Sequence, residues 1–411
     1  MKLINKSSIK AILGQIPLTA ELYGLLRQPN KSLTADFSLD QLDQNLPTWK
    51  SQAVAARKSA QPGSKVLIFG MLRYWLEHAT LLGLTLAGMG HRVTLAYLPY
   101  AKWQIPMDRF NLRRQSLYTQ GVLVQADPLL NVVPLATSKQ EQLPPELEKT
   151  IQLVALRDTQ YTLQVEEVSL DSDLYRLRLE RNLAAARAAY ALLRKERPQV
   201  VILPNGTILE FGALYQVARY LYIPTVTYEF GEQRDRIWLA QNAEVMRQST
   251  DDLWALRRHI PLKAAQLEQV RKLIEARQHA ALWENFARRW QGVPSEGGDK
   301  VRAELGLDQR PIVLLATNVI GDSLTLGRQI FSDSMTEWLE RTVLFFANHP
   351  EVQFVARIHP GELVTKGPSV ADVVQRALPE LPSHIHLVAA DAKINTYDLV
   401  EIADIGLVYT T

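Results

Sequence analysis

Residues 65–98 read KVLIFGMLRYWLEHATLLGLTLAGMGHRVTLAYL, and this stretch decides the fold. It opens with an apolar run at 65–70, which is typical of a buried parallel strand. A helix is expected over 76–89, and Gly90 follows it where helices often stop in a left-handed residue. A second strand is expected at 92–98. Two strands joined by a helix form a right-handed crossover, so the stretch predicts a parallel sheet.

The same alternation continues through the first half of the chain. The pattern predicts a helix near 108–119, a strand near 151–156, a helix over 171–196, and strands at 200–203 and 224–229. Between the last two strands, Thr207 and Glu210 have the spacing of a capping box. This spacing predicts that Thr207 caps the start of a helix and that Glu210 reaches back to it.

The alternation restarts after a helical, charged region at 250–292 and a turn-rich segment at 291–298. Strands are expected at 311–316, 352–356, 384–388 and 405–409, with short helices over 369–377 and 397–403. Ser334 and Glu337 form a second capping-box pattern, which predicts a helix that begins there.

Together these elements predict an α/β protein with two Rossmann-like domains whose parallel sheets face a cleft. The expected parts are a helical extension at 1–62, a first domain at 63–245, a helical linker at 246–299 and a second domain at 300–411. The chain stops directly after a strand, whereas a doubly wound sheet normally continues with further strand–helix units. We therefore expect that the second domain is incomplete and that the sequence is a truncated form of a longer protein.

The composition bounds the function. The 411 residues suffice for two or three domains, and 47% hydrophobic and 22% charged residues exclude a disordered chain or a coiled-coil rod. A net charge of +3 supports a few anion contacts but no dedicated nucleic-acid binding. The absence of cysteine excludes disulfides, thiolate zinc sites and a cysteine nucleophile. Without an apolar run of membrane-spanning length or a signal peptide, a cytoplasmic protein is expected.

Polar residues follow the strands of the second half. They occupy 317–323, 357–362, 389–395 and 410–411, and they converge on one edge if the sheet is parallel. The set holds a guanidinium, an imidazole, hydroxyls, an amide and backbone amides near glycines. Such groups bind a phosphate or diphosphate, although ordinary polar loops would look the same.

Three segments of the second half resemble motifs of one family. Residues 357–362, RIHPGE, are similar to the Arg-x-His-Pro-x-Glu element of bacterial capsule-polysaccharide glycosyltransferases, which are two-domain GT-B enzymes related to the Kdo transferases. Residues 317–322, TNVIGD, resemble their Thr-Asn-Val-x-x-Asp loop. Residues 397–411 resemble their Tyr-Asp-Leu…Ala-Asp…Ser-Thr segment, with Thr410 in place of serine and the Val-Gly-x-Glu that should follow missing. In the first half, residues 87–94 match a GT-B style Gly-His-x-Val-Thr stretch.

The resemblance implies a glycosyltransferase that moves a sugar from a CMP- or UDP-linked donor to a surface or capsule polysaccharide or a glycolipid. His359 would bind the donor nucleotide, while Arg357, Thr410 and Thr411 would neutralise or hydrogen-bond its phosphates. The residues that match the family motifs, and that we expect at the donor site, are Thr317, Asn318, Asp322, Arg357, His359, Glu362, Thr410 and Thr411. Domain closure would exclude water and align donor with acceptor.

Two residues compete for the role of catalytic base if the reaction inverts the anomeric centre. Glu229 follows a strand of the first domain, and His78 lies soon after the first strand. A structural or acceptor-binding role remains open for Glu229, and His78 could be an ordinary helix-face histidine. If the reaction retains configuration, both residues could bind the acceptor instead.

No cofactor and no metal ion are expected, because fixed hydrogen-bond donors can stabilise a phosphate leaving group and the nucleotide-sugar is itself a substrate. The Asp-x-Asp at 171–173 precedes a long helix, where acidic residues favour the helix dipole rather than a metal. The expected partners are the nucleotide-sugar and a glycan or glycolipid acceptor, with peripheral association with the inner membrane face and no nucleic acid. The alternatives are a non-catalytic binding module of the same pathway and a nucleotide-sugar epimerase of the same fold.

Overall fold

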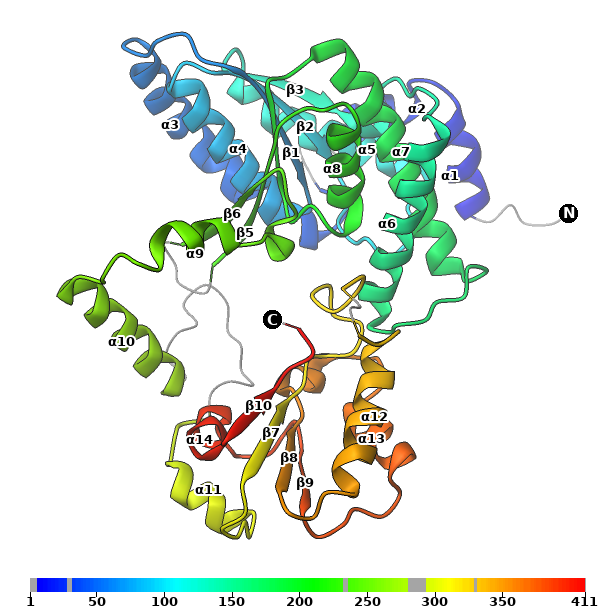
Figure 1. Ribbon diagram of the computed structural model, residues 1–411. Coiled ribbons are helices and arrows are strands. Elements are labelled where there is room, and N and C mark those ends of the chain that lie inside the picture. The colour runs from blue at the N-terminus through cyan, green and yellow to red at the C-terminus, as the bar shows by residue number, and fades with distance from the viewer. Residues whose placement is uncertain (1–5, 28–31, 232–235, 280–292, 329–330, 411) are drawn as a thin grey trace, which may run out of the picture. The chain divides into compact units, whose positions relative to one another are not determined.

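The computed structural model describes residues 6–27, 32–231, 236–279, 293–328 and 331–410 (Figure 1). The chain divides into two compact units. The first comprises Met1–Asp158, Ser169–Glu229 and Leu239–Met246, and the second comprises Thr159–Val168, Phe230–Trp238 and Arg247–Thr411. Each unit is organised around its own sheet, and the α/β class expected from the sequence is confirmed.

The first sheet has six strands in the order β3-β2-β1-β4-β5-β6. Its strands are β1 (Lys65–Met71), β2 (Arg92–Leu98), β3 (Leu130–Pro134), β4 (Val200–Pro204), β5 (Thr225–Phe230) and β6 (Ile237–Gln241). The pairs β2–β3, β1–β2, β1–β4 and β4–β5 are parallel. This is the strand order of a Rossmann sheet. Successive strands are added on one side of β1 up to β3 and then on its other side from β4 onward, so the strand order reverses between β1 and β4.

Eight α-helices of the described residues belong to the first half of the chain (Figure 1). They are α1 (Lys6–Gln15), α2 (Thr19–Arg27), α3 (Asp40–Arg57), α4 (Arg73–Gly88), α5 (Arg109–Leu123), α6 (Pro145–Leu163), α7 (Asp173–Glu196) and α8 (Leu209–Tyr220). Leu42 and Leu46 of α3 join Ile68 of β1 and Leu95 of β2 in one buried cluster. Helix α3 therefore contributes buried residues to the core of the first unit.

Three expectations for the first half are wrong. Residues 151–156 are not a strand but lie inside α6, where Ile151, Val154 and Ala155 are buried at helical spacing. Thr207 does not cap α8, because the helix begins at Leu209 and no side chain accepts a hydrogen bond at its cap. Glu210 does not reach back to the cap either, since its carboxylate accepts a hydrogen bond from Arg178 at 2.9 Å.

The second sheet has four strands in the order β10-β7-β8-β9, and all its pairs are parallel. Its strands are β7 (Ile312–Ala316), β8 (Gln353–Arg357), β9 (Ile385–Val388) and β10 (Ile405–Leu407). The helices of this half are α9 (Asp251–Arg257), α10 (Ala264–Gln278), α11 (Gly298–Glu304), α12 (Met335–Ala347), α13 (Val370–Ala377) and α14 (Thr396–Ile402). The capping role of Ser334 is confirmed, because its side chain accepts a hydrogen bond from the Glu337 N–H at 3.0 Å.

Helices cover both faces of this sheet (Figure 1). Val313 and Leu315 of β7 pack with Leu339 of α12 and Val373 of α13. Leu314, which points to the opposite face, packs in a second cluster with residues of α11 and α14. Burial on both faces explains why β7 is a continuous apolar run.

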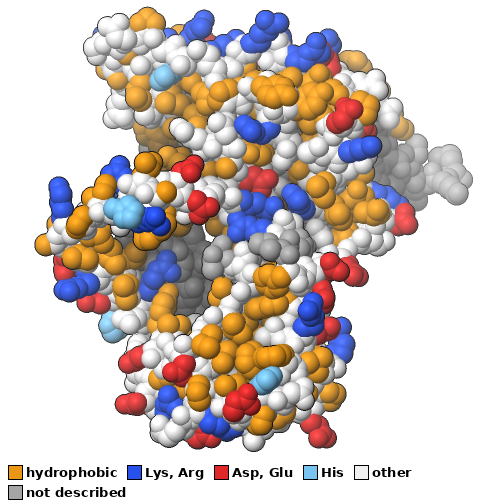
Figure 2. All heavy atoms as spheres, viewed as in Figure 1, with side chains coloured by type: hydrophobic (Ala, Val, Ile, Leu, Met, Phe, Trp, Pro, Cys, Tyr) orange, Lys and Arg blue, Asp and Glu red, His pale blue; other side chains and the backbone are white. Residues whose placement is uncertain are grey.

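Helices α9 and α10 bury none of their residues. Figure 2 shows apolar side chains interspersed with lysine and arginine along this part of the chain. The helical character expected for 250–292 is thus observed over α9 and α10, while 280–292 lies outside the described residues. No helix in the described ranges combines the length and apolar character needed to cross a bilayer.

Candidate active site

In the first unit, the candidate residues lie at the carboxyl edge of the sheet, next to the point where the strand order reverses. Ligands of open α/β sheets bind in this position. The backbone here is unusual, because the φ angles of Leu72, Asn205 and Leu209 are 61°, 56° and 55°. Non-glycine residues in this region are strained, and such strain collects at functional sites.

His78 is held by a buried tyrosine. Its Nδ1 atom lies 3.1 Å from the hydroxyl of Tyr228, a residue of β5. The ring of Trp75 packs edge-on against Tyr228 at 5.6 Å. Burial lowers the pKa of His78 below its usual 6.5, so the imidazole is neutral at pH 7. This contact fixes the orientation of a neutral imidazole, as a general base requires.

Glu229 is the next residue of β5. Its carboxylate accepts a hydrogen bond at 3.3 Å from the side-chain amide of Asn205, the residue directly after β4. Asn205 also accepts hydrogen bonds from the N–H groups of Thr207 and Ile208 at 3.0 and 3.4 Å, which shapes the turn. The negative charge of Glu229 contributes, after burial, to the raised pKa of Tyr228. The structure thus brings both candidates for the catalytic base to β5 and its surroundings.

The second unit gathers most of the expected donor residues at the carboxyl edge of its sheet. Thr317 joins the ends of β7 and β8, because its hydroxyl donates to the Arg357 carbonyl at 3.2 Å and accepts from the His359 N–H at 3.0 Å. Asn318 donates to the carbonyl of Thr410 at 3.3 Å, just after β10. Arg328 approaches the Thr410 hydroxyl at 3.4 Å. Residues that follow three different strands are therefore joined into one hydrogen-bonded group.

The protonation of His359 follows from one contact. The backbone N–H of Gly361 donates to its Nδ1 atom at 2.9 Å. Since Nδ1 is an acceptor there, the ring proton resides on Nε2 and the side chain is a hydrogen-bond donor at that atom. A Cβ atom at position 361 would lie 2.7 Å from Nδ1, so this approach requires glycine.

Arg357 hydrogen-bonds the loop that follows β9. It is buried, and its guanidinium donates to the carbonyls of Ala389 and Ile394, the latter at 3.3 Å. Burial lowers its pKa. These contacts shape the loop at 389–395, and a direct role of Arg357 toward phosphate stays a prediction.

The remaining expected donor residues have local structural contacts. Asp322 accepts a hydrogen bond from the Leu324 N–H at 2.8 Å in its own turn. The Glu362 carboxylate accepts from the Val370 N–H at 3.2 and 3.3 Å, which satisfies the start of α13. Burial raises the pKa of Glu362. Thr411 lies outside the described residues.

Sequence reasoning missed several residues of these two edges. Tyr228 and Asn205 could have been suggested by their positions at the ends of predicted strands, but not their partners. Glu166 had no signal at all, yet its carboxylate accepts from the N–H groups of Met335 and Thr336 at 2.6 and 3.0 Å. It therefore satisfies the positive start of α12, close to the loops that follow β7.

Among the described residues, no group of three or more histidine, aspartate or glutamate side chains could hold a metal ion. In the Asp-x-Asp segment, the side chain of Ser172 caps α7 by accepting from the Tyr175 N–H at 3.3 Å. Asp171 and Asp173 are fully exposed and lie near Arg176.

No protein-family model matches the chain, and no curated protein matches it significantly. Three solved structures are similar to it. The calicheamicin glycosyltransferase CalG4 is 14% identical, with 84% of this chain and 75% of that chain covered and a TM-score of 0.22. The UDP-GlcNAc 2-epimerase from Neisseria meningitidis bound to UDP-GlcNAc is 13% identical, with 84% and 77% covered and a TM-score of 0.23. The glycotransferase of kitacinnamycin is 14% identical, with 85% and 75% covered and a TM-score of 0.23. The fold class rests on the strand orders of the two sheets.

Proposed function

We propose that the chain is a GT-B type glycosyltransferase that moves a sugar from a nucleotide-sugar to a surface or capsule polysaccharide or a glycolipid, without a metal ion. The observation that carries the proposal is the hydrogen-bonded group at the end of β7, β8 and β10. Its hydrogen bonds tie the backbone of His359, whose Nε2–H is a donor, to Thr317 and tie Thr410 to Asn318, at the edge where α/β sheets bind ligands.

The chemistry of such a site is leaving-group stabilisation. Cleavage of a glycosyl–phosphate bond builds negative charge on the phosphate oxygens, and fixed donors aimed at that charge lower the barrier. His359 suits this role because the Gly361 N–H holds its proton on Nε2. In an inverting reaction, the acceptor hydroxyl loses its proton to a base of the first unit. His78 fits that role as a neutral imidazole, with Glu229 as the rival carboxylate.

The donor half of the proposal is tested by differential scanning fluorimetry with CMP, UDP, AMP and GMP. One of the pyrimidine nucleotides is expected to raise the melting temperature of the wild type. His359→Asn keeps an acceptor for the Gly361 N–H but removes the imidazole, so it should weaken binding about tenfold to a hundredfold, the cost of a hydrogen bond to a charged group. His349→Ala is the control, because this histidine is partly exposed and precedes β8, at the opposite edge of the sheet. Equal binding by all three proteins refutes the donor site.

The transferase activity is tested separately with the nucleotide-sugars of the bound nucleotide. Incubation with polysaccharide and glycolipid acceptors should release the nucleotide and extend the acceptor, as mass spectrometry would detect. Isomerised donor without transfer would identify an epimerase instead, and binding without either product would identify a binding module. The acceptor, the cytoplasmic location and association with a membrane stay predictions.

A further inference from the structure

A pocket opens in the first unit at the carboxyl ends of β2 and β3, and we call it the α7 pocket because one face of α7 lines it. Its volume is about 460 Å³, within the range of small-molecule sites. The residues that matter here are Leu98, Tyr100, Arg109, Leu135, Gln140 and Glu180. None of them belongs to the candidate active site, whose residues in this unit follow or lie in β1, β4 and β5.

Much of the lining of the α7 pocket is aliphatic. Leu98 is the last residue of β2, Leu135 directly follows β3, and both are buried. Leu112 of α5 and Leu177 of α7 line the pocket as well and are half-buried. These side chains offer an apolar surface, so a ligand gains free energy by placing an apolar group against them.

The loop between β2 and α5 is held in place from α7. The buried Arg181 donates to the carbonyls of Lys102 and Ile105 at 3.1 and 2.6 Å. Its guanidinium also lies 4.1 Å from the centre of the Tyr100 ring. The charge of Arg181 is therefore engaged with the loop, and the position of Tyr100 in the pocket is fixed.

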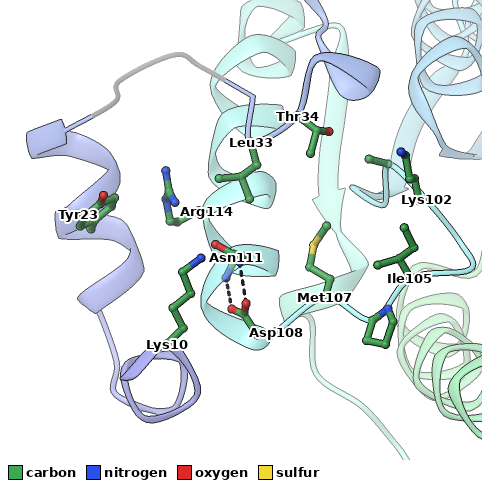
Figure 3. Close-up of a pocket in the computed structure, with 12 residues that line it drawn as sticks. Lys10, Tyr23, Leu33, Thr34, Lys102, Ile105, Met107, Asp108, Asn111 and Arg114 are labelled. Carbon is green, nitrogen blue, oxygen red and sulfur yellow. Dashed lines mark hydrogen bonds between the residues drawn. The ribbon is translucent and has the colours of Figure 1, made fainter. Parts of the chain in front are cut away.

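The start of α5 is fixed as well. Asp108 caps this helix by accepting hydrogen bonds from the backbone N–H and the side-chain amide of Asn111, at 2.8 and 2.6 Å (Figure 3). Figure 3 also shows Met107, which lines both the α7 pocket and the neighbouring cavity beside α1, α2 and α5. Arg109, the first residue of α5, thus projects from a defined backbone. Preorganised walls of this kind lower the entropic cost of binding.

Tyr100 brings a buried polar group to the pocket. It is 8% exposed, and no described residue is a hydrogen-bond partner of its hydroxyl. Burial raises the pKa of Tyr100 to about 12, so the hydroxyl keeps its proton and can donate. Because a buried hydroxyl without a hydrogen bond costs free energy, this group favours a polar ligand in the pocket.

Two opposite charges line the pocket from different walls. Arg109 comes from α5 and Glu180 from α7, and both are exposed. Neither forms an ion pair with any residue that the structure describes, so they are not paired with each other. The side-chain amide of Gln140 adds a further donor and acceptor. A cavity with a separate cation and anion is complementary to a molecule that carries both charges.

We infer that the α7 pocket binds a small zwitterion, an α-amino acid with an apolar side chain. Arg109 binds its carboxylate, Glu180 binds its ammonium group, and the leucines contact its side chain. A simple anion would be repelled by Glu180 and a simple cation by Arg109, whereas a sugar would place hydroxyl groups against the leucines. Binding of an amino acid needs no nucleotide-sugar, so this inference and the proposed sugar transfer can each fail alone.

The test is isothermal titration calorimetry of the full chain with L-leucine and L-phenylalanine, without nucleotide. At least one of them should bind. The N-acetyl derivative lacks the ammonium group and the amide derivative lacks the carboxylate, so each should bind about tenfold to a hundredfold more weakly, the cost of a hydrogen bond to a charged group. Arg109→Gln and Glu180→Gln should weaken binding of the amino acid by the same range, and Tyr100→Phe by about twofold to tenfold.

A matched control and a cycle of variants and derivatives separate direct contact from a structural effect. Arg92→Gln removes an exposed arginine at the first residue of β2, on the opposite edge of the sheet, and should bind like the wild type. In Glu180→Gln, N-acetylation should cost little further affinity, because the partner of the ammonium group is already gone. In Arg109→Gln, the same should hold for the amide derivative.

Four results would overturn the inference. The first is no binding of either amino acid to the wild type. The second is binding of the N-acetyl and amide derivatives as tight as that of the amino acid. The third is equal affinity in the wild type, Arg109→Gln and Glu180→Gln, which would place the binding elsewhere. The fourth is binding of methyl glucoside that depends on Tyr100 while amino acids do not bind, which would identify a sugar subsite.

Discussion

Arg178→Met is expected to destabilise the first unit by about 3–5 kcal/mol, the usual cost of removing one partner of a buried ion pair. Arg178 is wholly buried and donates to Asp158 at 2.6 Å and to Glu210 at 2.9 Å. Without it, two buried carboxyl groups lose their counter-charge. The Trp103 carbonyl loses its partner as well.

The measurement is urea unfolding followed by far-UV circular dichroism. Arg176→Met on the same helix is the control, because Arg176 is exposed and pairs with two exposed aspartates, Asp171 and Asp173; it should cost below about 1 kcal/mol. Adding Asp158→Asn and Glu210→Gln to Arg178→Met should restore much of the loss, since neutral groups tolerate burial better.

The loss should also depend on pH. Burial already raises the pKa of Asp158, and in Arg178→Met this carboxyl group loses the counter-charge that opposes the effect, so its protonated form is favoured in the fold. Such groups contribute stability at low pH and lose it as pH rises through the raised pKa. The variant should therefore approach the wild type as pH falls from 8 to 5. A loss below 1 kcal/mol, or one equal to that of Arg176→Met, would refute the reasoning.

Three further predictions concern the two sheet edges and one helix. Gly361→Ala places a Cβ atom 2.7 Å from Nδ1 of His359, so nucleotide affinity should fall about tenfold in calorimetry while the melting temperature of the free protein changes little. If His78 is the base, His78→Gln should lower the transfer rate by a factor of about 10²–10⁴ and abolish the acidic limb of the pH–rate profile. In the wild type, the rate rises with pH as His78 loses its proton. Because burial lowers the pKa of His78, this acidic limb should lie below pH 6.5. Tyr228→Phe, which removes the 3.1 Å contact, should shift that limb, whereas an unmoved limb would favour Glu229. Ser334→Ala removes the cap of α12 and should cost about 1 kcal/mol in thermal unfolding, with Ser383→Ala as a control outside any helix.

Much of the fold follows from the sequence because buried parallel strands are apolar runs between helices. The strand expected at 92–98 has the same bounds as β2, and the capping role of Ser334 is local chemistry. The errors arise where apolar character is ambiguous or shared. Residues 151–156 form a buried helical face whose apolar pattern resembles that of a strand. Strand β3 was not expected from the sequence, because it ends in Pro134 and proline is unfavourable in strand interiors.

The sequence predicts at which edge of each sheet the candidate site residues lie, but it does not predict which side chains contact one another. Parallel strands bring the residues that follow them to one edge, and this rule anticipated the group that joins Thr317, His359 and Thr410. The rule cannot show which side chains meet. His78 and Tyr228, which are in contact, are 150 residues apart in the sequence. Glu210 pairs with Arg178 instead of capping its own helix, and this pairing depends on packing between helices. The tautomer of His359 required the position of one backbone N–H.

The most direct measurement is nuclear magnetic resonance of the histidine side chains, labelled with ¹⁵N, as nucleotide is added. The chain has 8 histidines, and His359→Asn assigns the resonance of interest. The free protein should show His359 as a neutral ring with its proton on Nε2, and the Nε2–H signal should move in proportion to the fraction of protein bound. A His359 signal that stays fixed while nucleotide binds, or that reports a proton on Nδ1, would contradict the donor site.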